Sequence, residues 1–469
     1  MDSELWRWQA CDLAHAIRTR RISSREAVAS CLGRLEQVNP RINAVVDVLA
    51  DEALTAADRA DRAVAAGEAL GTLHGVPVTY KINMDYAGRP TTDGVVAFKD
   101  RMAKVDNPAI ANWRKAGAIA IGRTNVPPFS ARFFTSNALH GRTLNPWDAG
   151  RTPGGSSGGA AAAVATGIGP LAHGSDRAGS VRYPAYACGV LGLRPTIGRI
   201  PSFNATAPED ASLTTQITHT QGPLARSVRD LRLGYAAMAT GDPHDPWWTP
   251  VDTASQGLVH PGPVALFTEN PGAEMDPAIS ATLRAAAGWL EDAGYRVEQA
   301  APPHFEEIAR LFFTLIRSEE RSSTTSAIDR LGDDQLRRAR ASTMSYASEL
   351  DYDGYIKAFG RRAAILREWQ LFFERYPLLV MPVSSLRPVP VDYDQQGNEA
   401  VAHMLRSHHP MLAISMLGLP GLAVPTGQIR GVPVGVQLVS GRFREDICLT
   451  AAEVIEARYP ASTPIEPRG

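Results

Sequence analysis

Apolar positions along the chain recur with two periods, which predicts alternating helices and strands. After Ser23 they repeat every three or four residues through 27–38, and Glu26 completes a helix capping box with that serine. Short runs of apolar or β-branched residues are instead typical of buried strands. Such runs stand within 71–85 and at 118–123, 168–172, 264–267, 295–299, 378–382, 422–425 and 432–439, and the run at 44–49 is either a strand or a turn of helix.

Between these runs the pattern predicts helices, so the chain reads as an α/β sandwich. An alanine-rich helix over 160–165 is stopped by Gly167 and Gly169. The stretch 305–375 is charged, poor in glycine and helical in pattern, and we interpret it as an insertion that caps the core. Further helices are predicted at 51–67, 107–116, 227–238, 277–293 and 447–458.

Two segments without regular periodicity are interpreted as loops. The polar segment 197–221 is one. The other, 125–147, carries two prolines and three phenylalanines and is equally compatible with a packed loop or with one wall of a substrate pocket. In the second case the lining residues would be Phe129, Ser130, Phe133 and Phe134.

Composition narrows the class of protein. The 469 residues are 44% hydrophobic and 21% charged, with a formal net charge of -1, so no basic field for nucleic acid is present. The four cysteines have no CxxC spacing, which favours reduced thiols. The first residues lack a signal-peptide pattern, and no apolar run is long enough to span a bilayer. We therefore expect a cytoplasmic protein without membrane or nucleic-acid partners.

Residues 151–196 concentrate glycine, serine and alanine more than any other part of the chain. The run 154–159 reads GGSSGG, and a second serine loop, 174–180, follows the alanine-rich helix and a strand. A glycine–serine run is usually a flexible linker, but a linker does not require an adjoining apolar helix and strand. Two such loops can bring both hydroxyls to one point and direct backbone N–H groups at a substrate.

Lys81 is unusual in this arginine-rich chain. Only five of the 48 basic residues are lysines, and Lys81 lies among apolar residues in or at the end of a predicted strand. A strand-end lysine commonly extends to water. A desolvated lysine has a lowered pKa and can give up its proton, whereas arginine cannot. The choice of lysine at this position therefore suggests that deprotonation matters.

These residues predict a serine hydrolase with Ser180, Ser156 and Lys81 as its catalytic groups. A neutral lysine can take the proton of a serine nucleophile, and a second serine can relay that proton. The backbone N–H groups of Arg177, Ala178, Gly179 and Ser180 would then form the oxyanion hole.

Other classes fit the sequence less well. GGSSG matches the G-x-S-x-G pattern of an α/β-hydrolase esterase using Ser156, but a proline-bearing loop precedes it instead of a strand. A phosphate-binding loop lacks the GK[ST] motif. His403, His408 and His409 could cluster near a helix end, yet without cysteine or acidic support such spacing is usually chance.

The motifs together resemble the amidase signature family. GGSSGG stands 24 residues before Ser180 in GSDRAGSVRYPA, and Lys81 in HGVPVTYKINMD stands 75 residues before Ser156. The resemblance extends through NPW, CGVLGLRPT and GLPGLAVPTG to GVPVGVQLV, and so covers nearly the whole chain outside 305–375. It implies a single α/β/α domain, 1–469, around a mixed sheet, with no metal or organic cofactor.

The resemblance also implies residue roles. Ser180 would be the acylated nucleophile, Ser156 the bridging serine with a cis peptide bond to Gly155, and Lys81 the base. Asp176 and Arg182 would brace the nucleophile loop, and Ser157 would support the hydrogen-bond network. Arg177 and Ala178 replace the Thr-Gly common in the family, and Ile82 replaces an acidic residue that often follows the lysine. Arg177 could bind a polar or anionic group or turn outward.

The resulting expectation is an enzyme that hydrolyses a small or aryl-containing amide through an acyl-serine. Hydrazides, carbamates and esters share the same acyl-transfer geometry. The family also contains the glutaminase subunit of a tRNA-dependent amidotransferase, which would act within a multi-chain complex. The expected partner is a small-molecule amide, and a homodimer is left open.

Overall fold

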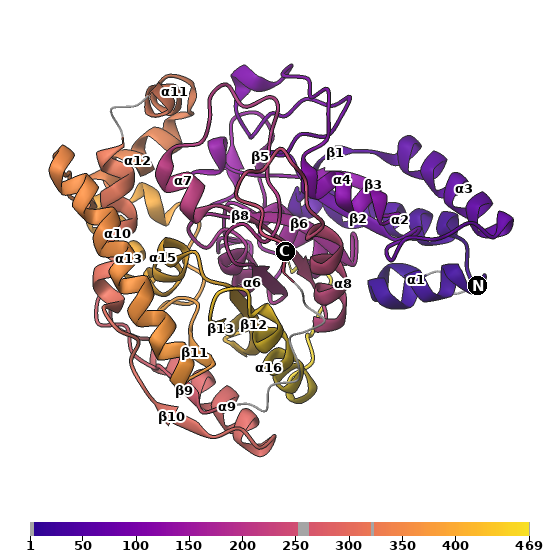
Figure 1. The fold of residues 1–469 in the computed structure, drawn as a ribbon. Helices are drawn as coiled ribbons and strands as arrows, with labels where there is room; N and C mark the ends of the chain where they lie inside the picture. Colours follow the sequence, from indigo (N-terminus) through magenta and orange to yellow (C-terminus); the bar gives the residue numbers. More distant parts are fainter. Residues whose placement is uncertain (1–3, 252–261, 320–322, 469) are drawn as a thin grey trace.

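The computed structural model describes residues 4–251, 262–319 and 323–468. An eleven-stranded mixed sheet runs through its centre in the order β1-β3-β2-β6-β8-β7-β12-β13-β11-β9-β10 (Figure 1). β2 is parallel to both β3 and β6, whereas β8, β7, β12 and β13 follow one another antiparallel. The strands are β1 (Val45–Val48), β2 (Pro77–Lys81), β3 (Ile119–Thr124), β6 (Leu171–Asp176), β7 (Leu191–Arg194), β8 (Thr220–Ala225), β9 (Val264–Leu266), β10 (Val297–Gln299), β11 (Leu378–Pro382), β12 (Gly421–Ile429) and β13 (Val432–Ser440).

Helices cover both faces of the sheet because strand side chains alternate between two apolar cores. Leu378 and Val380 point into one core, whereas Leu379 and Met381 of the same strand point into the other. The first core is covered by α1 (Ala10–Arg18), α4 (Pro108–Lys115), α8 (Val228–Met238), α9 (Pro277–Asp292) and α16 (Glu445–Arg458). The second is covered by α2 (Ser24–Ile42), α3 (Ala50–Ala66), α5 (Gly158–Thr166), α6 (Arg182–Cys188), α10 (Phe305–Ser318), α13 (Tyr352–Arg375), α14 (Asn398–Ser407) and α15 (His409–Leu417). The predicted α/β/α sandwich around a mixed sheet is confirmed.

Local signals set several element boundaries as the sequence predicts. Ser23 and Glu26 form the complete capping box at the start of α2. α3 ends at Gly67, whose positive φ of 70° suits glycine, and α5 ends in the same way at Gly167, with φ 81°.

The prediction of one polar loop over 197–221 is wrong in its second half. That half contains α7 (Leu213–Thr218) and the first residues of β8. Ser212 caps α7 by accepting from the Thr215 amide. The sequence of β8, TQGPLA, shows poor alternation of apolar and polar residues. It is nevertheless a buried central strand, because the strands on both sides pair with it. β7, which carries Arg194, is also absent from the sequence prediction.

The described residues of the stretch 305–375 are mainly helical. α10, α11 (Ser323–Leu331), α12 (Asp334–Tyr346) and α13 gather at one side of the molecule, opposite α1 to α3 (Figure 1). α10 packs on α15 and α12 on α14, so this stretch is joined to the C-terminal part of the core. In the segment 125–147, the short strands β4 (Ser136–Asn137) and β5 (Gly141–Arg142) form a separate pair. No helix in the described ranges has the length and apolarity that crossing a bilayer requires.

Candidate active site

The two serine loops lie against each other at the ends of β6 and α5. The Ser157 amide donates to the carbonyl of Ser180 at 3.2 Å, and Ser157 Oγ donates to the carbonyl of Ser175 at 3.3 Å. Both contacts exist because β6 leads directly into the second loop while α5 starts directly after the first. Ser157 therefore joins the two loops.

Lys81, the last residue of β2, reaches into this junction. Its Nζ donates to Ser156 Oγ at 2.7 Å and to Ser175 Oγ at 2.9 Å, and its side chain is fully buried. The peptide bond between Gly155 and Ser156 is cis. Ser175 was not assigned a role from the sequence, although it lies in the serine loop, because only the parallel pairing of β2 with β6 brings it beside Lys81.

Burial lowers the pKa of Lys81 well below its usual range, and the carboxylates of Asp93 and Asp176 oppose that shift only in part. A lysine in this state can be neutral near physiological pH and accept a proton from a hydroxyl. Lys81 is thus a candidate base, whereas an arginine in its place would stay protonated.

Asp93 is a second titratable group beside Lys81, and no motif in the sequence marks it. Ser130 Oγ donates to Asp93 Oδ1 at 2.8 Å, and Asn83 Nδ2 donates to Ser130 Oγ at 3.1 Å. Burial raises the pKa of Asp93, while the Ser130 hydrogen bond and the charges of Lys81 and Arg101 oppose the rise. Lys81 and Asp93 are therefore electrostatically linked.

Asp176 fixes the loop that carries Ser180. Its carboxylate accepts from the amides of Gly179 at 2.8 Å and Val181 at 3.2 Å, and from Nε and Nη2 of Arg182 at 3.0 Å each. Arg194 Nη1 adds a contact of 3.2 Å. Burial alone would raise the pKa of Asp176, but the two guanidinium groups and the Gly179 amide hold it well below its usual range. Arg194 was missed from the sequence because the strand β7 that presents it was missed.

The amides of the loop 177–180 are not equivalent. The Gly179 N–H is taken by Asp176 and is a poor candidate for an oxyanion hole. Among the described residues, no protein acceptor binds the amides of Ala178 and Ser180. The amides of Ala178 and Ser180 therefore remain candidate donors to a substrate oxygen. Arg177 directly precedes Ala178 in this loop.

A cavity of about 1060 Å³ opens onto this site, with Ser156, Ser175 and Ser180 in its wall. Phe129, Ser130 and Phe133, three of the residues proposed from the sequence as a pocket wall, line this cavity. The opposite wall comes from the helical stretch, through residues that include Phe312, Phe313, Leu336 and Met344. A third part of the cavity wall comes from residues 197–219 and includes His219. Burial and the positive charges of Lys81 and Arg177 lower the pKa of His219 to about 3.

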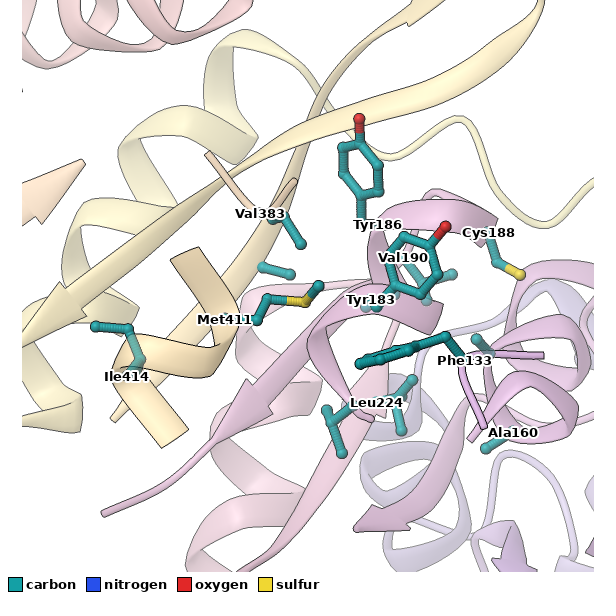
Figure 2. Packing of buried hydrophobic residues seen from close by; sticks show 14 of the residues in the cluster. Phe133, Ala160, Tyr183, Tyr186, Cys188, Val190, Leu224, Val383, Met411 and Ile414 are labelled. Atoms are coloured by element: carbon teal, nitrogen blue, oxygen red, sulfur yellow. The ribbon is translucent and has the colours of Figure 1, made fainter. Parts of the chain in front are cut away.

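The expectation that Phe134 lines the cavity is wrong. Phe134 is 3% exposed and belongs to the apolar core, because successive side chains of this segment point in different directions. Figure 2 shows Phe133 beside Tyr183 of α6, and their rings are 6.1 Å apart and nearly perpendicular. Phe133 therefore joins the core to the cavity wall.

The histidines near α15 do not form a metal site. In the described parts of the chain no group of three histidine, cysteine or acidic side chains is placed to hold a metal ion. His408 packs against the rings of Phe133 and Tyr183, at 4.7 and 4.5 Å. His409 Nε2 shares a hydrogen bond of 2.7 Å with the Tyr346 hydroxyl.

An eleven-stranded mixed sheet with a buried lysine bonded to a serine of a glycine-rich loop points to a serine-dependent amide hydrolase. The family model described as Amidase matches residues 26–449, and the chain belongs to this amidase family and is an amide-hydrolysing enzyme. It is 45% identical to an indoleacetamide hydrolase of Bradyrhizobium diazoefficiens over 97% of this chain and 87% of that protein. A glutamyl-tRNA(Gln) amidotransferase subunit of Moorella thermoacetica is 34% identical, over 97% of each chain.

Solved structures agree with this assignment. A 6-aminohexanoate cyclic dimer hydrolase in complex with substrate has a TM-score of 0.84 at 26% identity and covers 99% of each chain. A bacterial aryl acylamidase of the amidase signature family has a TM-score of 0.81 at 26% identity and covers 98% of this chain and 99% of its own. The α/β-hydrolase alternative fails because the chain belongs to the amidase family, and because a loop precedes Ser156 and its side-chain hydrogen-bond partner is Lys81.

Proposed function

We propose that the enzyme hydrolyses the amide of an aryl-substituted small carboxylic acid, of the indoleacetamide kind, through an acyl intermediate on Ser180. The observation that carries the proposal is the hydrogen bond from buried Lys81 to Ser156 in the wall of a cavity that Ser180 also lines. The aromatic part of the wall (Phe129, Phe133, Phe312 and Phe313) suits an aryl group, and the relative with 45% identity is an indoleacetamide hydrolase.

In the proposed acylation step, neutral Lys81 takes the proton of Ser156 as Ser156 takes that of Ser180. Ser180 Oγ then attacks the amide carbonyl carbon, and the amides of Ala178 and Ser180 donate to the oxygen as it becomes negative. Asp176 supports this step by holding the loop in place through Gly179 and Arg182.

Collapse of the tetrahedral intermediate breaks the C–N bond, and the leaving nitrogen needs a proton. Ser156 supplies it and is reprotonated by the Lys81 ammonium, so the base of the first half acts as the acid of the second. Water then attacks the acyl-Ser180 ester by the same proton route, which releases the carboxylic acid. Ser175 holds Lys81 toward Ser156 through its 2.9 Å hydrogen bond.

The helical stretch 305–375 belongs, in this proposal, to the single domain 1–469 and acts as a cap that determines which acyl groups fit. Six of its side chains in the cavity wall are apolar, which favours a bulky apolar group on that side. They are Phe312, Phe313, Ile316, Ile328, Leu336 and Met344. All four cysteines are free thiols, which supports a reducing compartment such as the cytoplasm.

The test combines covalent labelling with turnover by the purified chain. A serine-directed fluorophosphonate should label Ser180, as located by peptide mass spectrometry, and Ser180→Ala should abolish the label. Lys81→Ala should slow labelling. A label on Ser156 in the wild type would contradict the assignment of the nucleophile.

Turnover distinguishes the substrate classes. The isolated chain should release ammonia from indole-3-acetamide and from phenylacetamide. Poor activity of the isolated chain on both aryl amides would instead support the glutaminase subunit of an amidotransferase, which would act only within a multi-chain complex.

A further inference from the structure

The guanidinium of Arg177 lines the active-site cavity without a protein partner. Its Nε is buried and unbonded, and within the described ranges the side chain makes no hydrogen bond or ion pair. Arg177 is only partly exposed, toward the cavity, and a charged group partly withdrawn from water without a partner is unfavourable unless a ligand completes its interactions. The proposed hydrolytic steps give the Arg177 side chain no role, so its position in the cavity wall points to another function.

The groups around Arg177 do not neutralise it. Among the described residues, Glu319 is the carboxylate that influences the charge of Arg177, but Glu319 Oε1 already accepts from the Thr214 amide and the Tyr355 hydroxyl, each at 2.8 Å. Arg340 of α12 also lines the cavity and cannot neutralise Arg177, because it is itself a cation, which forms an ion pair of 3.2 Å with Asp329. Burial lowers the pKa of Arg177 to about 10, so the group stays protonated at neutral pH.

Arg177 also stands in a fixed relation to the reacting atoms. It is three residues before Ser180, in the loop that Asp176 holds by hydrogen bonds to Gly179 and Val181. Apolar side chains of α10 and α12, among them Phe313 and Met344, line the same cavity. The cavity thus combines an apolar wall with a cation held near the nucleophile.

We propose that Arg177 binds a carboxylate on the part of the substrate remote from the scissile bond. This inference rests on the proposed function and narrows its substrate class to amides of aryl or alkyl acids that carry a second, anionic carboxylate. The planar guanidinium can donate two parallel N–H bonds to a carboxylate, an arrangement that lysine cannot reproduce.

The experiment compares phenylacetamide with its meta- and para-carboxy derivatives. Since hydrogen bonds to charged groups are stronger than neutral ones, the wild type should prefer the better carboxylated amide by about ten-fold or more in kcat/KM. Arg177→Met should bring this ratio close to unity, and Arg177→Lys should give an intermediate value. The matched control is Arg338→Met, an exposed arginine of α12 that bonds Gln395, and it should keep the wild-type ratio.

A wild type that hydrolyses phenylacetamide, is labelled at Ser180 and shows no preference would overturn the carboxylate subsite and leave the proposed function standing. An Arg177→Met variant that loses both substrates equally would likewise contradict it. If neither amide is hydrolysed, the proposed function fails, and calorimetric binding of the same amides to Ser180→Ala decides the subsite separately. If the carboxylated amide binds more tightly and Arg177→Met abolishes this difference, the carboxylate subsite is supported. Equal binding of the two amides overturns the subsite.

Discussion

Lys81 Nζ lies 2.7 Å from Ser156 Oγ, and both side chains are buried at the junction of β2 with the glycine-rich loop. The contact joins residues 75 positions apart in the sequence. It brings an ammonium group whose pKa is lowered by burial to a hydroxyl in the wall of the cavity. The first two predictions depend on this pair.

Replacing Lys81 by arginine should lower kcat for amide hydrolysis by about 10²–10⁴-fold, the usual contribution of a general acid–base group. Arginine keeps the positive charge but cannot release its proton, so the variant separates charge from basicity. Steady-state kinetics on an aryl amide provide the measurement, with circular dichroism to establish that the variant folds. Near-wild-type turnover by Lys81→Arg would exclude Lys81 as the base.

The pH dependence of kcat/KM should show an acidic limb that reports the deprotonation of Lys81, with activity rising as pH rises. Because the negative charge of Asp93 favours the Lys81 ammonium, Asp93→Asn should move this limb to lower pH. The control is Asp100→Asn, an exposed carboxylate, which should leave the limb in place. A limb that stays unchanged or moves to higher pH in Asp93→Asn would refute the electrostatic link.

Asp176→Asn should destabilise the protein by about 3–5 kcal/mol in urea unfolding, because it leaves buried Arg182 and Arg194 without their counter-charge. The folded-state pKa of Asp176 lies below the unfolded value of about 3.9, so its contribution is complete above that value and is lost as pH falls toward the folded pKa. Stability measured between pH 7 and pH 3 should therefore fall less steeply in Asp176→Asn than in the wild type. Equal slopes would show that this carboxylate does not drive the acid sensitivity.

Gly155→Ala should disrupt the loop before Ser156. A Cβ there would lie 2.5 Å from the Arg132 carbonyl oxygen and 2.6 Å from backbone atoms of Phe133 and Phe134. Overpacking against backbone typically costs about 1–3 kcal/mol, and the displaced Ser156 should also lose activity. Thermal unfolding and kinetics measure the two effects.

The matched glycine is Gly33 in α2, where a Cβ would meet nothing within 4 Å. Gly33→Ala should stabilise the protein by about 0.5–1 kcal/mol, since alanine loses less backbone entropy in a helix. If both alanine variants behave alike, the close contacts at Gly155 do not determine its identity.

Much of the architecture could be predicted because local signals specify it. The Ser23–Glu26 capping box, the glycines that end α3 and α5, and the strongly apolar strands are set by interactions within a few residues. The weak pattern of β8 and the short β7 could not be recognised, because their neighbours in the central sheet, rather than their own periodicity, make them strands.

The sequence by itself determined which residues are candidates for the site: two serine loops and one lysine in an arginine-rich chain. Only the tertiary structure decided their partners. Ser175 and Asp93 come beside Lys81, and Arg194 reaches Asp176, through strand pairing and loop packing between segments distant in the sequence. The tertiary structure also determines the pKa of Lys81, because desolvation depends on every element that covers the side chain and not only on its neighbours in the sequence.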